Sequence, residues 1–88
     1  MNIKECVQLK INRKLIRFFL ENPASIDNSR GIATWINEGI EDTENALKDL
    51  LAAKLLVEHG SEATTAYGLT TNVSVIKKTK AFLKNLKT

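Results

Sequence analysis

The chain has 88 residues and a net charge of +3, with 43% apolar and 26% charged residues, which fits one globular domain with a modest core. No apolar run approaches the ~20 residues of a membrane-spanning helix, and the first residues lack the pattern of a secretory signal. Cys6 is the only cysteine, which excludes an internal disulfide and a multi-cysteine zinc site and favours a cytoplasmic, reducing location.

Two helical segments are expected before Pro23. Residues 1–11 fit a helical stripe and also strand alternation, and we favour a helix that continues into the next segment or ends just before it. Residues 12–21 predict an amphipathic helix with Asn12 as its N-cap. Asn22-Pro23 ends it, because the residue before proline is disfavoured in helical backbone. We expect Cys6 to be a buried apolar filler.

The middle of the chain predicts a helix-turn-helix. Residues 24–26 are expected to form a short strand, and Asp27 or Ser29 is expected to cap a helix over about residues 28–37. In that helix, Gly31 would let another helix approach closely, and Trp35 would be half-buried.

The turn is expected at residues 37–39, with Gly39 at positive φ or as a cap, and the second helix at about 40–53. Acidic residues in its first turns complement the helix dipole, and Glu44 with Lys48 forms a favourable i,i+4 pair. The residues expected to point inward are Thr43, Ala46, Leu47, Leu50 and Leu51.

A β-hairpin and a last helix follow. Two short apolar runs, at 55–57 and 66–70, are joined by a polar loop that contains glycine. Asn72 or Thr71 is expected to cap an amphipathic helix within residues 72–87. Its apolar stripe must pack either on the first helix of the same chain or on a second copy, and a twofold dimer is the commonest solution. The predicted homodimer interface consists of Ile76, Thr79, Phe82, Leu83 and Leu86.

The order of these segments resembles the winged helix-turn-helix DNA-binding domains of small prokaryotic transcriptional regulators, such as the MarR, ArsR and PadR groups. The resemblance spans residues 12–70 and rests on Ile32-Ala33, Leu47-x-x-Leu50, Leu55-Leu56-Val57 and Tyr67-Gly68-Leu69-Thr70. It implies a single domain over residues 1–88, mainly α with a small β-hairpin: a winged helix-turn-helix with an added C-terminal amphipathic helix. The family often has glycine where this chain has Lys54.

The resemblance further implies a transcriptional regulator that binds double-stranded DNA as a homodimer. Asn45 can pair with adenine, Glu44 can accept from the cytosine amino group, and Thr43 can reach a phosphate if it is exposed. Phosphate contacts are expected from basic residues of the motif and of the two ends of the chain. The candidate DNA-binding residues are Arg30, Thr43, Glu44, Asn45 and Lys48.

The charge distribution opposes this interpretation. Residues 1–20 carry five Lys or Arg and one Glu, residues 21–70 carry three against nine acidic residues, and residues 71–88 carry five Lys and no acid. The second motif helix is therefore acidic where DNA readers are usually basic. The alternative is a winged-helix protein–protein interaction module, whose acidic helix docks on a basic protein partner without direct DNA binding.

Catalytic chemistry finds little support. The chain has one His and one Cys, and it lacks a glycine-rich phosphate loop. His59 and Glu62 flank a loop but supply too few ligands for a metal ion. We therefore expect no enzyme activity, no cofactor and no metal.

Overall fold

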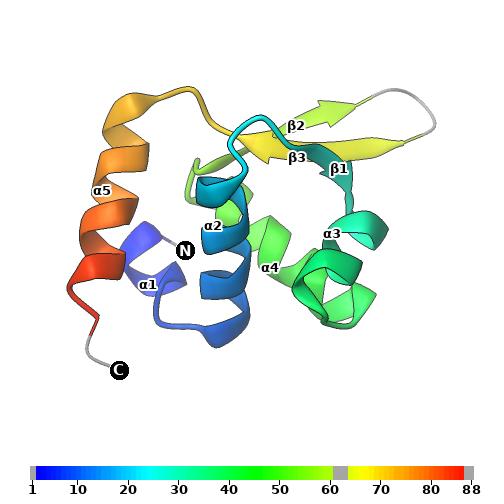
Figure 1. Cartoon of the computed structure of the whole chain (residues 1–88), viewed down its shortest axis with the longest axis horizontal. Coiled ribbons are helices and arrows are strands. Elements are labelled where there is room, and N and C mark those ends of the chain that lie inside the picture. The colour runs from blue at the N-terminus through cyan, green and yellow to red at the C-terminus, as the bar shows by residue number, and fades with distance from the viewer. Residues whose placement is uncertain (1, 61–63, 87–88) are drawn as a thin grey trace.

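The computed structural model describes residues 2–60 and 64–86 (Figure 1). The elements, in chain order, are α1 (Ile3–Cys6), α2 (Lys10–Glu21), β1 (Ile26–Asn28), α3 (Ser29–Ile36), α4 (Ile40–Ala52), β2 (Leu56–Gly60), β3 (Thr65–Leu69) and α5 (Val73–Lys84). This is the predicted fold, in which α3 and α4 form the helix-turn-helix, β2 and β3 form the wing, and α5 is the added helix. No described helix has the length and apolarity needed to cross a bilayer.

The first helices are separate. Asn2 and Glu5 form a reciprocal capping box at the start of α1, and a turn then leads to α2. The Arg13 guanidinium stabilises this turn by donating to the carbonyl oxygens of Val7 and Gln8, at 2.9 and 3.0 Å. Contrary to our prediction, Asn12 is not an N-cap. Helix α2 begins earlier, at Lys10, and Asn12 lies fully buried inside it.

The three strands form an antiparallel sheet in the order β1-β3-β2. β1 lies two residues later than predicted. Asn28, rather than Asp27 or Ser29, caps α3, because its side-chain oxygen accepts from the Gly31 amide at 2.9 Å. The Asp27 carboxylate occupies the space beside Gly31, where an added Cβ would overlap Oδ2. Gly31 therefore accommodates Asp27, not a neighbouring helix.

The turn between α3 and α4 also differs in detail from the expectation. Asn37 takes the left-handed conformation at φ 57°, whereas Gly39 has φ −65° and is the N-cap of α4. The predicted Glu44–Lys48 pair is not formed. Glu44 accepts instead from the Ser29 hydroxyl at 3.4 Å, and the only ion pair within the described ranges joins Lys14 to Glu38.

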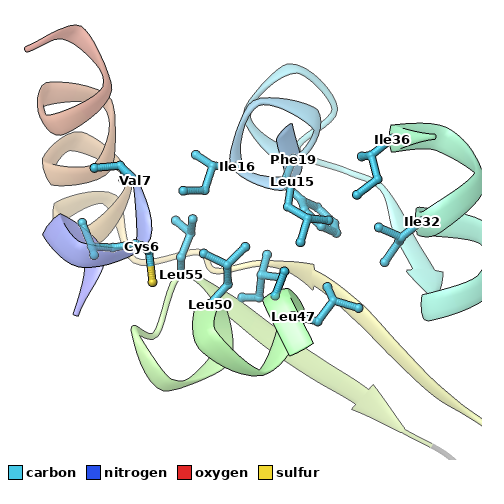
Figure 2. Close-up of a cluster of buried hydrophobic side chains, with 13 residues drawn as sticks. Cys6, Val7, Leu15, Ile16, Phe19, Ile32, Ile36, Leu47, Leu50 and Leu55 are labelled. Atoms are coloured by element: carbon cyan, nitrogen blue, oxygen red, sulfur yellow. The ribbon is translucent and has the colours of Figure 1, made fainter. Parts of the chain in front are cut away.

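The core runs as one cluster from α1 through α2 and α4 to α3 (Figure 2). Cys6 belongs to it and is fully buried, as predicted. The fully buried aliphatic and aromatic side chains at its centre are Leu15, Ile16, Phe19, Ile32, Leu47, Leu50 and Leu55. Among them, Leu47 and Leu50 were expected to point inward, so apolar periodicity located the core face of α4.

Helix α5 packs against α1 at one end of the molecule (Figure 1). Thr79 is fully buried there, and its hydroxyl donates to the Val75 carbonyl at 2.8 Å. Phe82, Leu83 and Leu86 are half-buried and pack against the same core. The prediction that Thr79 faces a second copy is therefore wrong, because this part of the α5 stripe packs within its own chain, which was the other option that the sequence left open.

Candidate nucleic-acid interface

Helix α4 buries one face in the core and exposes the opposite face to solvent. Thr43, Ala46, Leu47 and Leu50 are buried, so the opposite stripe lies on the surface. The residues of that stripe are all exposed and consist of Glu41, Glu44, Asn45, Lys48 and Ala52. Three of the predicted DNA contacts, Glu44, Asn45 and Lys48, thus share one surface.

Thr43 does not belong to this surface. Its side chain is fully buried, and its hydroxyl oxygen has no hydrogen-bond partner among the described residues. The condition for a phosphate contact, an exposed hydroxyl, is not met. The same position was also expected to point inward, and that expectation is the correct one.

Arg30 lies beside the amino end of α4. An open groove of about 550 Å³ is lined by exposed Arg30, by Thr34 and by the turn residues Asn37, Glu38 and Gly39, and the Glu38 carboxylate is paired with Lys14. Gly39 gives α4 no side-chain cap, so the first amide N–H groups of the helix are free to donate. A guanidinium next to uncapped helix amides is suited to an anion such as a phosphate.

Glu44 lies in an acidic corner between α3, α4 and the sheet. Tyr67 on β3 stands in register between Asp27 on β1 and Glu58 on β2. Burial, followed by the charges of Glu58 and Glu44, raises the pKa of Tyr67 above its usual 10.0. Glu44 and Glu58 thus both lie near enough to Tyr67 to act on it, and Glu44 also accepts from Ser29.

Asn45 has acidic neighbours too. It lines a groove of about 290 Å³ between α2 and α4 together with Asp42 and Asp49. The buried Asn12 amide donates to Asp49 across this groove at 3.4 Å. A base contact by Asn45 would therefore be made between two carboxylates.

The basic helices do not compensate for these acids. Helix α5, with Lys77, Lys78, Lys80 and Lys84, lies at the opposite end of the long axis from α3 (Figure 1). Arg13 and Lys14 of α2 are used inside the fold, by the α1–α2 turn and by Glu38. Arg30 and Lys48 are thus the cations that α3 and α4 themselves present. The described strands of the wing carry no Lys or Arg, and loop residues 61–63 fall outside the described ranges.

Sequence reasoning missed one surface feature. Trp35 is 71% exposed and stacks on Phe18, with ring centroids 6.0 Å apart and an interplanar angle of 30°. We expected Trp35 to be half-buried. Ile32, Ala33 and Ile36 complete the buried stripe of α3 without it, and that spacing was the available signal.

No protein-family model matches the chain, and no curated protein matches it. Solved structures do match the chain. A possible transcriptional regulator from Methanosarcina mazei Go1 superposes with a TM-score of 0.70 at 12% identity, covering 93% of this chain and 73% of that one. MepR, a transcription regulator of the Staphylococcus aureus multidrug efflux pump MepA, gives 0.68 at 21% identity, covering 85% and 55%.

The ST1889 protein of the thermoacidophilic archaeon Sulfolobus tokodaii gives a TM-score of 0.70 at 20% identity, covering 94% of this chain and 81% of that one. At such identities the likeness is one of fold. It confirms the winged helix-turn-helix that the sequence resemblance implied.

Proposed function

We propose that this chain is a cytoplasmic, DNA-binding transcriptional regulator that acts as a homodimer. The observation that carries the proposal is the position of Arg30 beside the uncapped amino end of α4, with Asn45 and Lys48 exposed further along that helix. Two of the structures that share its fold are described as transcription regulators, one of them as a possible one.

Each residue has a distinct role in this proposal. Arg30 and the first amides of α4 hold one phosphate, and Lys48 contacts another. Asn45 reads a base edge, for which adenine offers a matching donor and acceptor. Glu44 accepts from a cytosine amino group in exchange for its bond to Ser29.

The small number of cationic side chains on α3 and α4 determines how tightly DNA should be bound. Two phosphate contacts per protomer give a dimer a slope of log affinity against log salt of about −4. The carboxylates of Glu41 and Asp42 further oppose approach to DNA. We therefore expect binding that is weak at physiological salt and clear only at low salt.

Fluorescence anisotropy with mixed-sequence duplexes, titrated with salt, tests the proposal. Arg30→Ala and Lys48→Ala should each weaken binding and reduce the salt slope by about 1 per lost phosphate contact. Lys80→Ala is the matched control, since Lys80 lies on α5, at the other end of the molecule. Absence of duplex binding at low salt would overturn the proposal.

The acidity of α4 favours a second candidate, a module that docks on a basic protein. Glu41→Gln separates the two, because it removes one negative charge from the amino end of the outward stripe. If α4 lies against DNA, the variant binds duplex more tightly. If α4 docks on a basic protein, the variant captures that protein less well from nuclease-treated lysate, and duplex binding is absent in both forms.

A further inference from the structure

The molecule has an exposed aromatic face away from the α4 stripe. It comprises the exposed Trp35 on α3, the 54% exposed Ile26 on β1 and the half-buried Phe18 on α2. Trp35 and Phe18 line two open grooves, one of about 450 Å³ and one of about 170 Å³. An exposed tryptophan flanked by grooves is typical of a protein–protein contact, where aromatic anchors fill pockets on the partner.

Helix α2 supplies the rest of this face as one continuous stripe. The residues that line the larger groove from α2 are Lys14, Arg17, Phe18, Glu21 and Asn22. They recur at i, i+3, i+4, i+7 and i+8, the spacing of a single side of a helix. The stripe therefore has the pattern of a helix that packs lengthwise against another helix.

The α2 stripe carries charged side chains of both signs that can pair with another molecule. Lys14 pairs with Glu38 inside the chain, whereas neither Arg17 nor Glu21 enters an ion pair with any described residue. Arg17 precedes Glu21 by four residues, which is the less favourable order for a pair within one helix. Each chain thus offers one free positive and one free negative group beside Phe18. A nucleic acid would require a net positive face, so this one does not suit it.

We propose that this aromatic face is the homodimer interface. Two copies pack α2 against α2 in antiparallel orientation about a twofold axis, and Trp35 of each copy fills the groove beside Phe18 of the other. Arg17 of each copy pairs with Glu21 of the other, so the interface holds two ion pairs and each free charge is used once. Such self-complementarity is what a twofold interface demands of a single surface.

The aromatic face is larger than one side of a helix. Helix α2 has 12 residues and is about 18 Å long. With Trp35 and Ile26 the aromatic face extends over three elements. The α5 stripe, the alternative predicted from sequence, is already packed on α1 and has Thr79 fully buried. The inference rests on the proposed function for its dimer, but it requires no DNA.

Sedimentation equilibrium of the whole chain without DNA tests the interface. Arg17→Glu places two glutamates opposite each other at each pair, and Glu21→Arg places two arginines there, so each should weaken dimerisation by roughly tenfold or more. The double variant Arg17→Glu/Glu21→Arg should restore it. Lys77→Glu on α5 makes the same charge change as Arg17→Glu and should leave the dimer intact.

Trp35 provides a second readout because it is the only tryptophan of the chain. Its emission should shift to the red on dilution through the dissociation constant, as the ring leaves the interface. Trp35→Ala should weaken the dimer, and circular dichroism of each variant checks that an exposed substitution has not unfolded it.

A wild-type chain that stays monomeric at high concentration would overturn the inference. So would a dimer that is insensitive to Trp35→Ala and to both charge reversals, because its interface would then lie elsewhere. A dimer that is sensitive to these substitutions but binds no duplex would support the interface and contradict the proposed function. Duplex binding by a monomer would support DNA binding and contradict the interface.

Discussion

Two residues of the helix-turn-helix adopt the left-handed backbone region that glycine tolerates best. Asn37 has φ 57° and Lys54 has φ 66°. Each follows a helix and donates its amide back into the last turn, and the next amide donates to the carbonyl one residue earlier, that of Ala33 or Leu50 respectively. Both helices therefore end in a Schellman motif, with a non-glycine residue at the left-handed position.

Lys54→Gly should stabilise the protein, because a side chain in this region costs energy that glycine does not incur. We expect a gain of about 0.5–1 kcal/mol in the free energy of unfolding, measured by urea denaturation. Lys54→Ala is the control, since it removes the same charge but keeps a Cβ, and it should show no gain. Equal effects of Gly and Ala would mean that the charge, not the backbone, matters.

For single residues, the sequence predicted some structural roles and missed others. The family resemblance marked Lys54 as unusual, and the left-handed backbone now explains why glycine suits that position. Asn12, however, was assigned a capping role from residue type alone. It is fully buried in a helix face that turns toward the core. Thr43 is also fully buried, as its helical position predicted, so its phosphate contact, which required exposure, is not available.

The elements were predicted best where apolar periodicity was strong. The ranges of α3, α4 and α5 agree with it to within about two residues. The cap of α3 was misassigned because three capping residues, Asp27, Asn28 and Ser29, are adjacent, and only the direction of each side chain decides among them. The packing partner of α5 was equally undecidable, because an apolar stripe does not specify whether it meets its own chain or another.

Asn72 is the element-scale feature most open to test. Its side-chain oxygen accepts from the amides of Ser74 and Val75, at 3.0 and 3.3 Å, and so caps α5. Asn72→Ala should cost about 1 kcal/mol in thermal or urea unfolding, and Asn72→Ser should recover most of it. Asn85→Ala, at the other end of α5, is the matched control and should have little effect. If both alanine variants behave alike, the cap does not stabilise α5.

The whole molecule should be less stable in alkaline solution. Burial, with a smaller contribution from the Asp49 charge, raises the pKa of the Cys6 thiol from 9.0 to about 11. The pKa of Tyr67 is also raised, by burial and by Glu58 and Glu44. Both groups hold their protons more tightly in the folded state than in the unfolded state. Their stabilisation is therefore complete below pH 9 and is lost as the pH rises from about 9 to about 11.

Urea denaturation at several pH values measures this loss. We expect the free energy of unfolding to be steady from pH 7 to 8 and to fall above pH 9, with a shallower fall for Cys6→Ala. Native Cys6 should also resist alkylation until the protein unfolds, because the thiolate is the reactive form and the thiol is buried. Stability that is constant up to pH 11 would contradict the prediction.

The packing of α5 on α1 has a kinetic consequence. Ile3 lines one groove together with Val75 and Lys78, which lie about 70 positions later in the chain. Contacts this distant in sequence are slow to form, because the intervening chain must lose its freedom before any contact is gained. The helices and wing between them can collapse first, with the closure of α5 as the last step. Amide hydrogens of α5 should therefore exchange with solvent before those of α2 and α4, through an opening that leaves the winged helix intact.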